Sequence, residues 1–328
     1  MSEVLVIRAD ATPDIGAGHV MRCLALAQAW ASNGNSVILV GRITIPWVCE
    51  RLRTEQIDVE FLEEEIETTQ NFQHLFAVME KYTVDWVVFD GYHFTYADQK
   101  SVCDAGYKLL VIDDCNHLPE YCCDILLNQN VGAERYSYQG SIGHKLLGIE
   151  YILLRQEVLN AIPIAMQKQT ELQVRNVLLT LGGGDMEHRF DMLRDLFKLP
   201  MWSGVSLRVV AGGTSLAAWD DLLQRCSAQV EVIKYASDMA ELMLWADFTI
   251  TAGGSTCWEL CALQSPFSTI VVAENQRDVV NYLERHSLST PVSLLPDVGL
   301  QQAAKLCPYL KGLGQFYEKI VSAMAAVN

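Results

Sequence analysis

The chain has 328 residues, 50% of them apolar and 20% charged, so it can form sizeable buried cores and is not a disordered polymer. This length exceeds what one ordinary core requires and favours two domains. The formal net charge of −16 and the sequence pI near 4.8 argue against a nucleic acid or an anionic membrane as partner, because polyanions repel an acidic surface.

The N-terminus and the cysteines indicate the compartment. The stretch MSEVLVIRAD lacks the basic segment and long apolar core of a secretory signal, and no stretch approaches the roughly 18 apolar residues that span a bilayer. The ten cysteines lie mostly in apolar segments, and the adjacent Cys122 and Cys123 form neither a CxxC motif nor a disulfide framework. We therefore expect buried, reduced thiols and a cytoplasmic protein without stable membrane association.

Apolar runs of strand length alternate with helical patterns through the first half of the chain. The run Val4–Ile7 precedes a helical pattern over residues 18–33. Further strand-like runs are SVILVG (Ser36–Gly41), DWVVFD (Asp85–Asp90), KLLVIDD (Lys108–Asp114), DILLNQN (Asp124–Asn130) and HKLLGIEYILL (His144–Leu154). Continuous apolar strands separated by helices predict a parallel sheet that is covered by helices on both faces.

The same alternation restarts after a looser stretch at 158–176, which we interpret as a linker with the edge of a helix. The runs that follow are NVLLTLGGGD (Asn176–Asp185), SLRVVAGG (Ser206–Gly213), VEVIKY (Val230–Tyr235), DFTITAGGST (Asp247–Thr256) and FSTIVVAENQ (Phe267–Gln276). The sequence therefore predicts an α/β protein with two doubly wound, Rossmann-like domains, residues 1–157 and 158–328. A closing helix at 314–328 could pack back on the first domain.

A glycine-rich turn with a histidine follows the first strand. In RADATPDIGAGHVMRC, Gly16 and Gly18 precede His19 at the start of the predicted helix, where backbone N–H groups and the helix dipole favour an anion. An imidazole there suits a general base. Asp10 and Asp90, each at the end of a strand, could orient it or hold a sugar hydroxyl. The plainer alternatives are a structural His19, with Asp10 capping the turn and Asp90 ending its strand.

The second half carries a candidate phosphate site. In TAGGSTCWELC a strand passes into a helix at Gly253, Gly254, Ser255 and Thr256, whose N–H groups and hydroxyls could bind a diphosphate. Glu259, one turn further, could accept hydrogen bonds from ribose hydroxyls. The alternative is a tight turn with Ser255 or Thr256 as N-cap and Glu259 as a capping-box acid.

Two further strand ends in the second half carry polar residues, and several common motifs are absent. The strand ends are the LGGGD loop and the segment Glu274–Gln276, and their convergence favours a nucleotide-diphosphate site. The chain has no GxxxxGK[ST] motif and no complete dinucleotide fingerprint. No pair of histidines or cysteines has zinc spacing, so we expect neither a metal nor a cofactor.

Several stretches together resemble one family. Two linked doubly wound domains with phosphate-binding turns in the second resemble the GT-B architecture, in which two such domains face each other across a cleft. RADATPDIGAGHVMRCLALAQAW, DWVVFDGY, LLVIDD, ILLNQN, LLGIEYILLR, VLLTLGGGD, MAELMLWADFTITAGGSTCWELCALQSP and AENQ look like the PseG/SpsG family of nucleotide-sugar hydrolases. The matching blocks occur in family order over most of residues 4–280, whereas GGSTxxE alone would also fit proteins that resemble MurG.

The resemblance implies a reaction and a set of site residues. The reaction is hydrolysis of UDP-2,4-diacetamido-2,4,6-trideoxy-beta-L-altropyranose to UDP and free sugar, with inversion, in pseudaminic acid or related surface-glycan biosynthesis. His19 would position or deprotonate the attacking water, and Tyr92 would line the sugar pocket. The residues implied to bind the UDP-sugar are Gly253, Gly254, Ser255 and Thr256 (diphosphate), Glu259 (ribose), Asn275 and Gln276 (diphosphate or sugar) and the backbone near Ile233 (uracil). We also place Asp10, Gly16, Gly18, Arg22, Asp90 and Gly183 in the substrate site.

Two departures and two alternatives accompany this expectation. The family often has a histidine where this chain has Gly91, which bears on the identity of the sugar, and its LGLP-like segment reads LQSP at Leu263–Pro266. The first alternative is a GT-B glycosyltransferase that passes the sugar to another acceptor, and the second is a protein that binds a nucleotide sugar without turnover. Nothing in the sequence indicates an oligomeric state.

Overall fold

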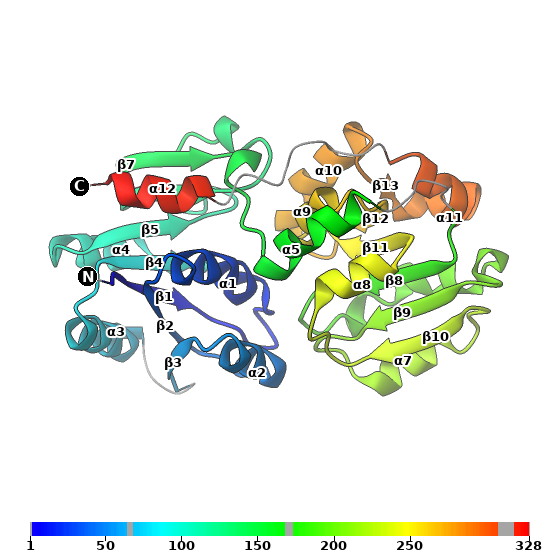
Figure 1. Ribbon diagram of the computed structural model, residues 1–328, viewed down its shortest axis with the longest axis horizontal. Helices are drawn as coiled ribbons and strands as arrows, with labels where there is room; N and C mark the ends of the chain where they lie inside the picture. The colour runs from blue at the N-terminus through cyan, green and yellow to red at the C-terminus, as the bar shows by residue number, and fades with distance from the viewer. Residues whose placement is uncertain (1, 64–67, 168–172, 308–317, 328) are drawn as a thin grey trace. The chain divides into compact units, whose positions relative to one another are not determined.

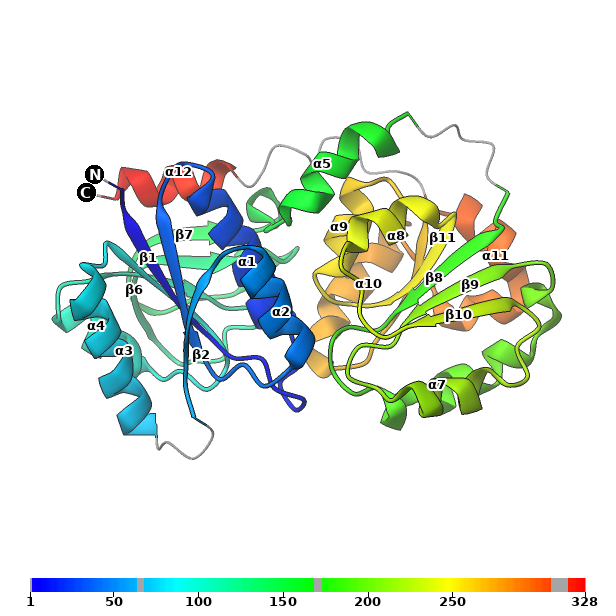
Figure 2. The same cartoon turned by 60° about the horizontal axis from the view of Figure 1, so that its bottom comes forward.

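The computed structural model describes residues 2–63, 68–167, 173–307 and 318–327 (Figures 1 and 2). The chain divides into two compact units, unit 1 with Met1–Arg155 and Gln315–Asn328, and unit 2 with Gln156–Gly314. Within the described ranges, no helix combines the length and apolar character needed to cross a bilayer.

Unit 1 is built on a seven-stranded parallel sheet with the order β3-β2-β1-β4-β5-β6-β7. Its strands are β1 (Val4–Ala9), β2 (Ser36–Gly41), β3 (Asp58–Phe61), β4 (Trp86–Asp90), β5 (Lys108–Ile112), β6 (Tyr121–Asn128) and β7 (Gly140–Leu147). Its helices are α1 (Gly18–Ala31), α2 (Pro46–Thr54), α3 (Thr68–Tyr82), α4 (Tyr96–Asp104) and α12 (Glu318–Ala326).

Alternate residues of each strand in unit 1 enter two different cores. On β1, Leu5 and Ile7 pack with α1, α2 and α12, whereas Val6 packs with α3 and α4 on the other face. This division follows from the two-residue period of a strand, and it explains why the strands read as continuous apolar runs. The sheet is therefore covered on both faces, as expected.

Unit 2 repeats the design with a six-stranded parallel sheet, β10-β9-β8-β11-β12-β13. Its strands are β8 (Asn176–Thr180), β9 (Ser206–Val210), β10 (Gln229–Ile233), β11 (Phe248–Ala252), β12 (Phe267–Ile270) and β13 (Thr290–Pro291). Its helices are α5 (Gln156–Ala165), α6 (Asp191–Arg194), α7 (Leu216–Leu223), α8 (Met239–Trp245), α9 (Thr256–Ala262), α10 (Arg277–Arg285) and α11 (Leu295–Lys305).

The strand order locates one special point on each sheet. In unit 1 the order reverses between the paired strands β1 and β4, and in unit 2 between the paired strands β8 and β11. Ligands of doubly wound sheets bind beyond the carboxyl ends of the strands at this switch point. Asp90 is the last residue of β4, and His19 stands at the start of α1, the helix that follows β1. Gly183 and Gly254 lie in the loops after β8 and β11, so all four candidate residues lie near the strand ends where ligands bind.

The ends of the units differ in detail from the sequence expectation. The looser stretch at 158–176 is in part helical, because α5 runs over Gln156–Ala165 despite Pro163, and residues 168–172 lie outside the described ranges. The expected boundary at 157/158 falls inside this helix. Of the expected closing helix, α12 contacts α1 in unit 1, and residues 314–317 lie outside the described ranges.

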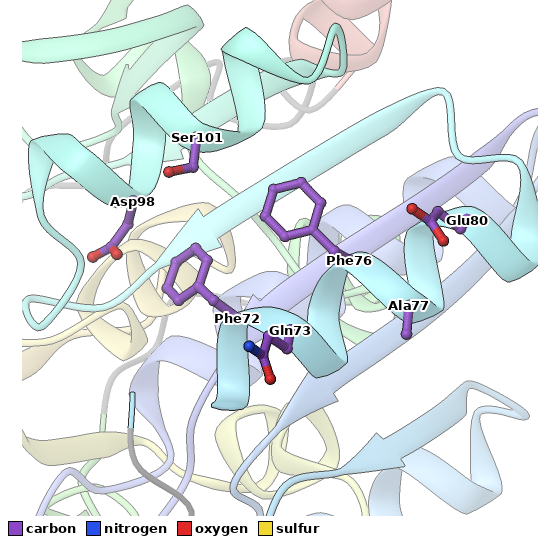
Figure 3. A pocket seen from close by; sticks show the side chains of 7 residues that line it. All are labelled: Phe72, Gln73, Phe76, Ala77, Glu80, Asp98 and Ser101. Atoms are coloured by element: carbon purple, nitrogen blue, oxygen red, sulfur yellow. The ribbon is translucent and has the colours of Figure 1, made fainter. Parts of the chain in front are cut away.

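A surface groove of about 510 Å³ lies between α3 and α4 in unit 1 (Figure 3). Its lining consists of Phe72, Gln73, Phe76, Ala77, Glu80, Asp98 and Ser101. None of the candidate site residues lines it, so the groove is separate from the strand ends that carry them.

Candidate functional site

The turn before His19 is closed on itself and leaves one side open. The Gly16 N–H donates to the Thr12 carbonyl at 2.7 Å, and Gly16 has a φ of 79°, which glycine adopts without the strain that a side chain would cause. A Cβ at Gly18 would meet no other atom within 4 Å. His19 is the second residue of α1, and the space next to the preceding Gly18 is open.

His19 is paired with Asp90, the last residue of β4. The Nδ1 atom of His19 lies 2.6 Å from Oδ1 of Asp90, which is fully buried. Burial by itself raises the pKa of a carboxyl, but the charge of Arg22 and the contact with His19 outweigh it and hold the pKa of Asp90 well below its usual range. Asp90 is therefore ionised at any pH at which the protein would work.

The ionised Asp90 determines the tautomer of His19. A carboxylate only accepts hydrogen bonds, so Nδ1 of His19 must carry the proton and donate it. The 3.2 Å contact between Nη2 of Arg22 and the same Nδ1 is then a contact between two donors, and both groups donate to Oδ1 of Asp90. Nε2 keeps its lone pair and has no hydrogen-bond partner among the described residues. This is the arrangement of a general base.

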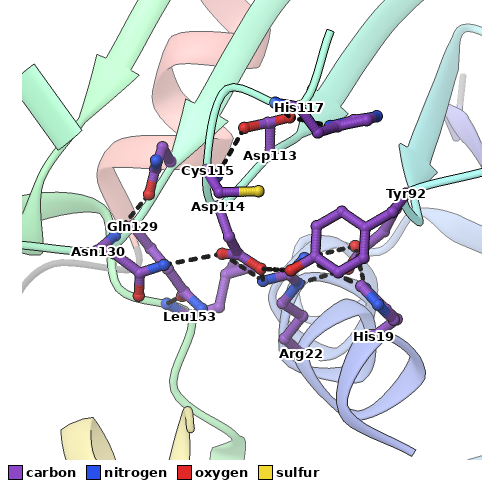
Figure 4. Close-up of polar contacts among 12 residues, drawn as sticks. His19, Arg22, Tyr92, Asp113, Asp114, Cys115, His117, Gln129, Asn130 and Leu153 are labelled. Atoms are coloured by element: carbon purple, nitrogen blue, oxygen red, sulfur yellow. Dashed lines mark hydrogen bonds and ion pairs between the residues drawn. The ribbon is translucent and has the colours of Figure 1, made fainter. Parts of the chain in front are cut away.

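Arg22 joins Asp90 to a second carboxylate, that of Asp114, which is the second residue after β5. Figure 4 shows Arg22 and Asp114 side by side. Nε and Nη2 of Arg22 each donate to Asp90 at 2.6 Å, while Nη1 donates to the two oxygens of Asp114 at 2.7 and 2.6 Å. The Arg22 side chain is 8% exposed. The two carboxylates therefore raise the pKa of Arg22 even though burial opposes its charge.

Tyr92 packs beside His19 and completes this cluster. Its hydroxyl donates to Oδ2 of Asp114 at 2.8 Å, and its ring meets the His19 imidazole edge-on with 5.1 Å between ring centroids. On its other side the ring lies 5.6 Å from that of His117 (Figure 4). Tyr92 thus stands between two imidazoles, those of His19 and His117.

Asp10 belongs to a neighbouring cluster and does not hold His19. It pairs with the Arg8 guanidinium and accepts the Arg42 N–H at 2.7 Å, and Nε2 of His93 lies 3.4 Å from it. Burial raises the pKa of Asp10, but Arg8 outweighs this effect and the pKa is lowered. Of the two carboxylates that the sequence offered as partners for His19, the structure selects Asp90.

Gly91 allows the His93 ring to fold back on the β4–α4 loop. A Cβ at Gly91 would lie only 2.8 Å from Cε1 of His93. Burial and the nearby Arg8 charge lower the pKa of His93, so its imidazole is neutral at neutral pH. The space next to Gly91 is therefore filled by a histidine that stands two residues later in the chain.

A separate pair, Asp113 and His117, anchors the same strand end. Asp113 is fully buried, and its carboxylate binds Nδ1 of His117 and accepts the Tyr121 hydroxyl at 2.8 Å. Burial lowers the pKa of His117, but the hydrogen bond and charge of Asp113 outweigh it, so the pKa of His117 is raised. The pair therefore stabilises the fold most when His117 is protonated.

We expect His117→Asn to lower the melting temperature of unit 1 more at pH 6 than at pH 9. A raised folded-state pKa contributes stability that is complete below the unfolded value of about 6.5 and is lost as the pH rises through the folded value. Calorimetric melting should show a difference of about 2–4 °C between the two pH values. As a control, the same substitution at the exposed His144 on β7 should lower the melting temperature equally little at pH 6 and at pH 9. A pH-independent loss at His117 would contradict this account.

In the glycine turn of unit 2, the backbone N–H groups that lack a partner are not the ones expected from the sequence. The Gly253 N–H donates to the Ile270 carbonyl at 3.2 Å, and the Gly254 N–H donates to the Ala252 carbonyl at 2.8 Å. The expectation that these glycine N–H groups are open to a phosphate is therefore wrong, because the neighbouring strand β12 accepts the first and the turn itself accepts the second. Among the described residues, the N–H groups of Ser255 and Thr256 have no backbone acceptor.

The two glycines serve different purposes. A Cβ at Gly253 would lie 2.4 Å from Cγ2 of Val280 on α10, so this position must be glycine for the helix to pack. A Cβ at Gly254 would meet nothing within 4 Å. Gly254 therefore leaves open space directly before Ser255 and Thr256.

The capping alternative for this turn is wrong. Ser255 stands at the N-cap of α9 but has helical backbone angles, and its side chain makes no cap hydrogen bond. Glu259 is 4% exposed and lies in the first turn of the helix. Its side chain is thus buried inside unit 2.

The remaining candidates of unit 2 lie at the ends of other strands. Gly183 is half-buried in the loop after β8, and Ile233 ends β10, where its carbonyl accepts the Ala211 N–H at 2.8 Å. Asn275 is exposed, whereas Gln276 is half-buried and its Oε1 accepts the Val272 N–H at 3.1 Å. The close approach of Gln276 to Gly253, 3.1 Å between their Cβ positions, brings these two strand ends together.

The structure adds residues that sequence reasoning did not single out as site residues. Asp114 and Asn130 are only the last residues of two strand-like runs in the sequence, and His93 and His117 belong to none of the runs. The available signal was position, because each follows a strand of the same sheet. Among the described residues, no group of three or more histidine, cysteine or acidic side chains is arranged to hold a metal ion.

Comparison with known proteins finds related sequences. Residues 204–287 match the glycosyltransferase family 28 C-terminal domain. The UDP-2,4-diacetamido-2,4,6-trideoxy-beta-L-altropyranose hydrolase of Campylobacter jejuni is 23% identical over 289 residues, which cover 86% of this chain and 96% of that protein.

Solved structures resemble the whole chain. The UDP-GlcNAc 2-epimerase of Neisseria meningitidis, bound to UDP-GlcNAc, superposes with a TM-score of 0.63 at 12% identity and covers 98% of this chain and 99% of its own. MurG of Acinetobacter baumannii gives a TM-score of 0.58 at 14% identity, covering 100% of this chain and 96% of its own. These likenesses confirm the expected fold: the chain has the GT-B fold.

Proposed function

We propose that this protein is a GT-B enzyme that hydrolyses a UDP-linked sugar to UDP and free sugar. The observation that carries the proposal is the His19–Asp90 pair at the switch point of unit 1, with Nε2 of His19 unengaged among the described residues. The substrate we propose is UDP-2,4-diacetamido-2,4,6-trideoxy-beta-L-altropyranose, which is supported by the similarity to the C. jejuni hydrolase.

His19 acts as the general base in this proposal. Nε2 takes a proton from a water molecule, whose oxygen attacks the anomeric carbon of the sugar while the bond to UDP breaks. Asp90 holds the imidazole through Nδ1 and stabilises the imidazolium that forms. Attack opposite the leaving group inverts the anomeric configuration.

Unit 2 binds the nucleotide. Negative charge develops on the departing UDP, and the open N–H groups and hydroxyls of Ser255 and Thr256 are suited to receive it without a metal. The carboxylate of Glu259 accepts the ribose hydroxyls, and the backbone at Ile233 receives the uracil. Asn275 and Gln276, which stand beside the same turn, contact the diphosphate or the sugar.

The direct test is proton NMR of the protein with this UDP-sugar, without an acceptor and with EDTA. Free sugar that appears first as the opposite anomer, together with UDP, is the expected result. An unchanged substrate in the presence of native, folded protein would contradict the proposal.

A glycosyltransferase is the second candidate, and the family 28 match of residues 204–287 is the observation that favours it. A transferase would release UDP only after a lipid or sugar acceptor is added. The acidic net charge of −16 speaks against docking on an anionic membrane, where lipid acceptors are found. If UDP were released only in the presence of an acceptor, the protein would be a transferase and not a hydrolase.

Glu259→Gln is expected to weaken UDP binding about tenfold, as judged by calorimetric titration. The substitution keeps the size of this buried side chain but removes the charge that strengthens its hydrogen bonds to ribose hydroxyls. His19→Gln in unit 1 serves as the matched control and should leave UDP affinity unchanged. Equal UDP affinity of the native and Glu259→Gln proteins would remove Glu259 from the nucleotide site.

A further inference from the structure

The residues around His19 have a charge balance that its pairing with Asp90 alone does not explain. Arg22 donates two hydrogen bonds to Asp90, the same carboxylate that holds His19. A guanidinium so close cancels much of the negative charge of Asp90. An imidazolium formed at His19 would then face a nearly neutral pair, which would make His19 a poor proton acceptor.

Asp114 removes this problem. Both of its carboxylate oxygens accept hydrogen bonds from Nη1 of Arg22, and its side chain is only 10% exposed. With His19 neutral, the four side chains of His19, Arg22, Asp90 and Asp114 carry one positive and two negative charges. One net negative charge therefore remains for an imidazolium to neutralise.

We propose that Asp114 is a positioning residue of the reaction, which occupies Arg22 so that the charge of Asp90 stays available to the protonated His19. Asp114 also fixes Tyr92 against the imidazole through the 2.8 Å bond from the phenol. The Asn130 amide, which donates to its Oδ1 at 2.9 Å, holds it in place (Figure 4). This inference rests on the proposed role of His19 as the base.

Other charged and titratable groups near His19 do not supply the missing charge. Cys23 on α1 donates to Asp90, and burial raises the pKa of its thiol, so it is neutral. His93 in the β4–α4 loop is neutral at neutral pH, and the Tyr92 phenol is itself a donor to Asp114. Asp10 forms an ion pair with Arg8, and His117 forms one with Asp113. Asp114 is the carboxylate that balances Arg22.

The test is an NMR pH titration of the His19 imidazole, with the signal assigned by its loss in His19→Gln. Asp114→Asn removes one negative charge, so His19 should take up its proton at a pH lower by about one unit. In the double variant Arg22→Gln/Asp114→Asn the net charge is restored, and the titration should return to the native position. Asp114→Glu, which keeps the charge, should also titrate like the native protein.

Two controls separate charge from packing. Asp113→Asn removes a fully buried neighbouring carboxylate that makes no hydrogen bond to Arg22, and should lower the melting temperature without moving the His19 titration. Tyr92→Phe removes the phenol bond to Asp114 and keeps the aromatic ring. If Tyr92→Phe reproduced the shift of Asp114→Asn, or if the double variant shifted further from the native titration, the charge argument would be wrong.

The fate of this inference is distinguishable from that of the proposed function. UDP release from the diacetamido sugar nucleotide is measured on the same proteins. No release by the native protein would overturn the hydrolase proposal whatever the titration shows. Normal release together with an unshifted His19 titration in Asp114→Asn would overturn only the role of Asp114.

Discussion

Replacing His19 with glutamine is expected to lower kcat for UDP release about 10³-fold while leaving UDP affinity unchanged. Glutamine has a similar size and can still contact Asp90, but it cannot take a proton from water. The ionised Asp90 engages Nδ1 of His19 and leaves the lone pair on Nε2 to accept a proton. Replacing the imidazole therefore removes the base without disturbing the fold. Single-turnover kinetics with the diacetamido sugar nucleotide would measure the effect.

The matched control for His19→Gln is His93→Gln, on the loop after β4. His93 pairs with Asp10 and not with Asp90, so its loss should change kcat far less than the loss of His19. A His19→Gln protein that turns over at the native rate would show that His19 is not the base. If His93→Gln lowered kcat as much as His19→Gln does, His93, which lies beside Asp10, would be the better candidate for the base.

Asp90→Asn is expected to lower kcat about 10²–10³-fold, with little change in UDP affinity. The amide can donate to Nδ1, which would place the imidazole proton on Nε2 and turn the base into a donor. The substitution also leaves the buried Arg22 with one carboxylate in place of two, so a lower melting temperature should accompany the kinetic loss. Steady-state kinetics and calorimetry on the same preparation separate these two effects.

Asp124→Asn is the control for Asp90→Asn. Asp124 lies on β6 of the same sheet and accepts the Leu109 N–H at 2.8 Å, but it touches none of His19, Arg22 and Asp114. Its loss should change stability and leave kcat within about twofold. The tautomer argument fails if Asp90→Asn lowers kcat no more than Asp124→Asn does.

Much of the fold could be predicted because its determinants are local and periodic. Runs such as SVILVG and KLLVI are apolar at every position after the first, so both faces of their strands must be covered, and a parallel sheet between helix layers does this. The weaker elements were missed. β3 (Asp58–Phe61) carries two acidic residues in four positions and is half-exposed at the sheet edge, so it has no apolar run to detect.

The position of His19 could also be predicted, since a glycine turn between an apolar strand and a helix marks a carboxyl end. The sequence likewise placed Asp90, Tyr92 and Gly254 at strand ends of the correct sheets. It suggested that the N–H groups of Gly253 and Gly254 are free, and this was wrong because both donate to backbone carbonyls, one on the neighbouring strand and one within the turn. Which donors a turn leaves over depends on how its backbone closes, which glycine content does not specify.

The sequence by itself thus determined two doubly wound sheets and the strand ends at which their candidate residues gather. Only the tertiary structure decided that His19 pairs with Asp90, 71 residues away, and not with the nearer Asp10. It also decided that Arg22 is enclosed by Asp90 and Asp114. The physical reason is that β4 pairs directly with β1 on the side opposite β2, so the neighbours of a strand end follow the order of strands in the sheet and not their order in the chain.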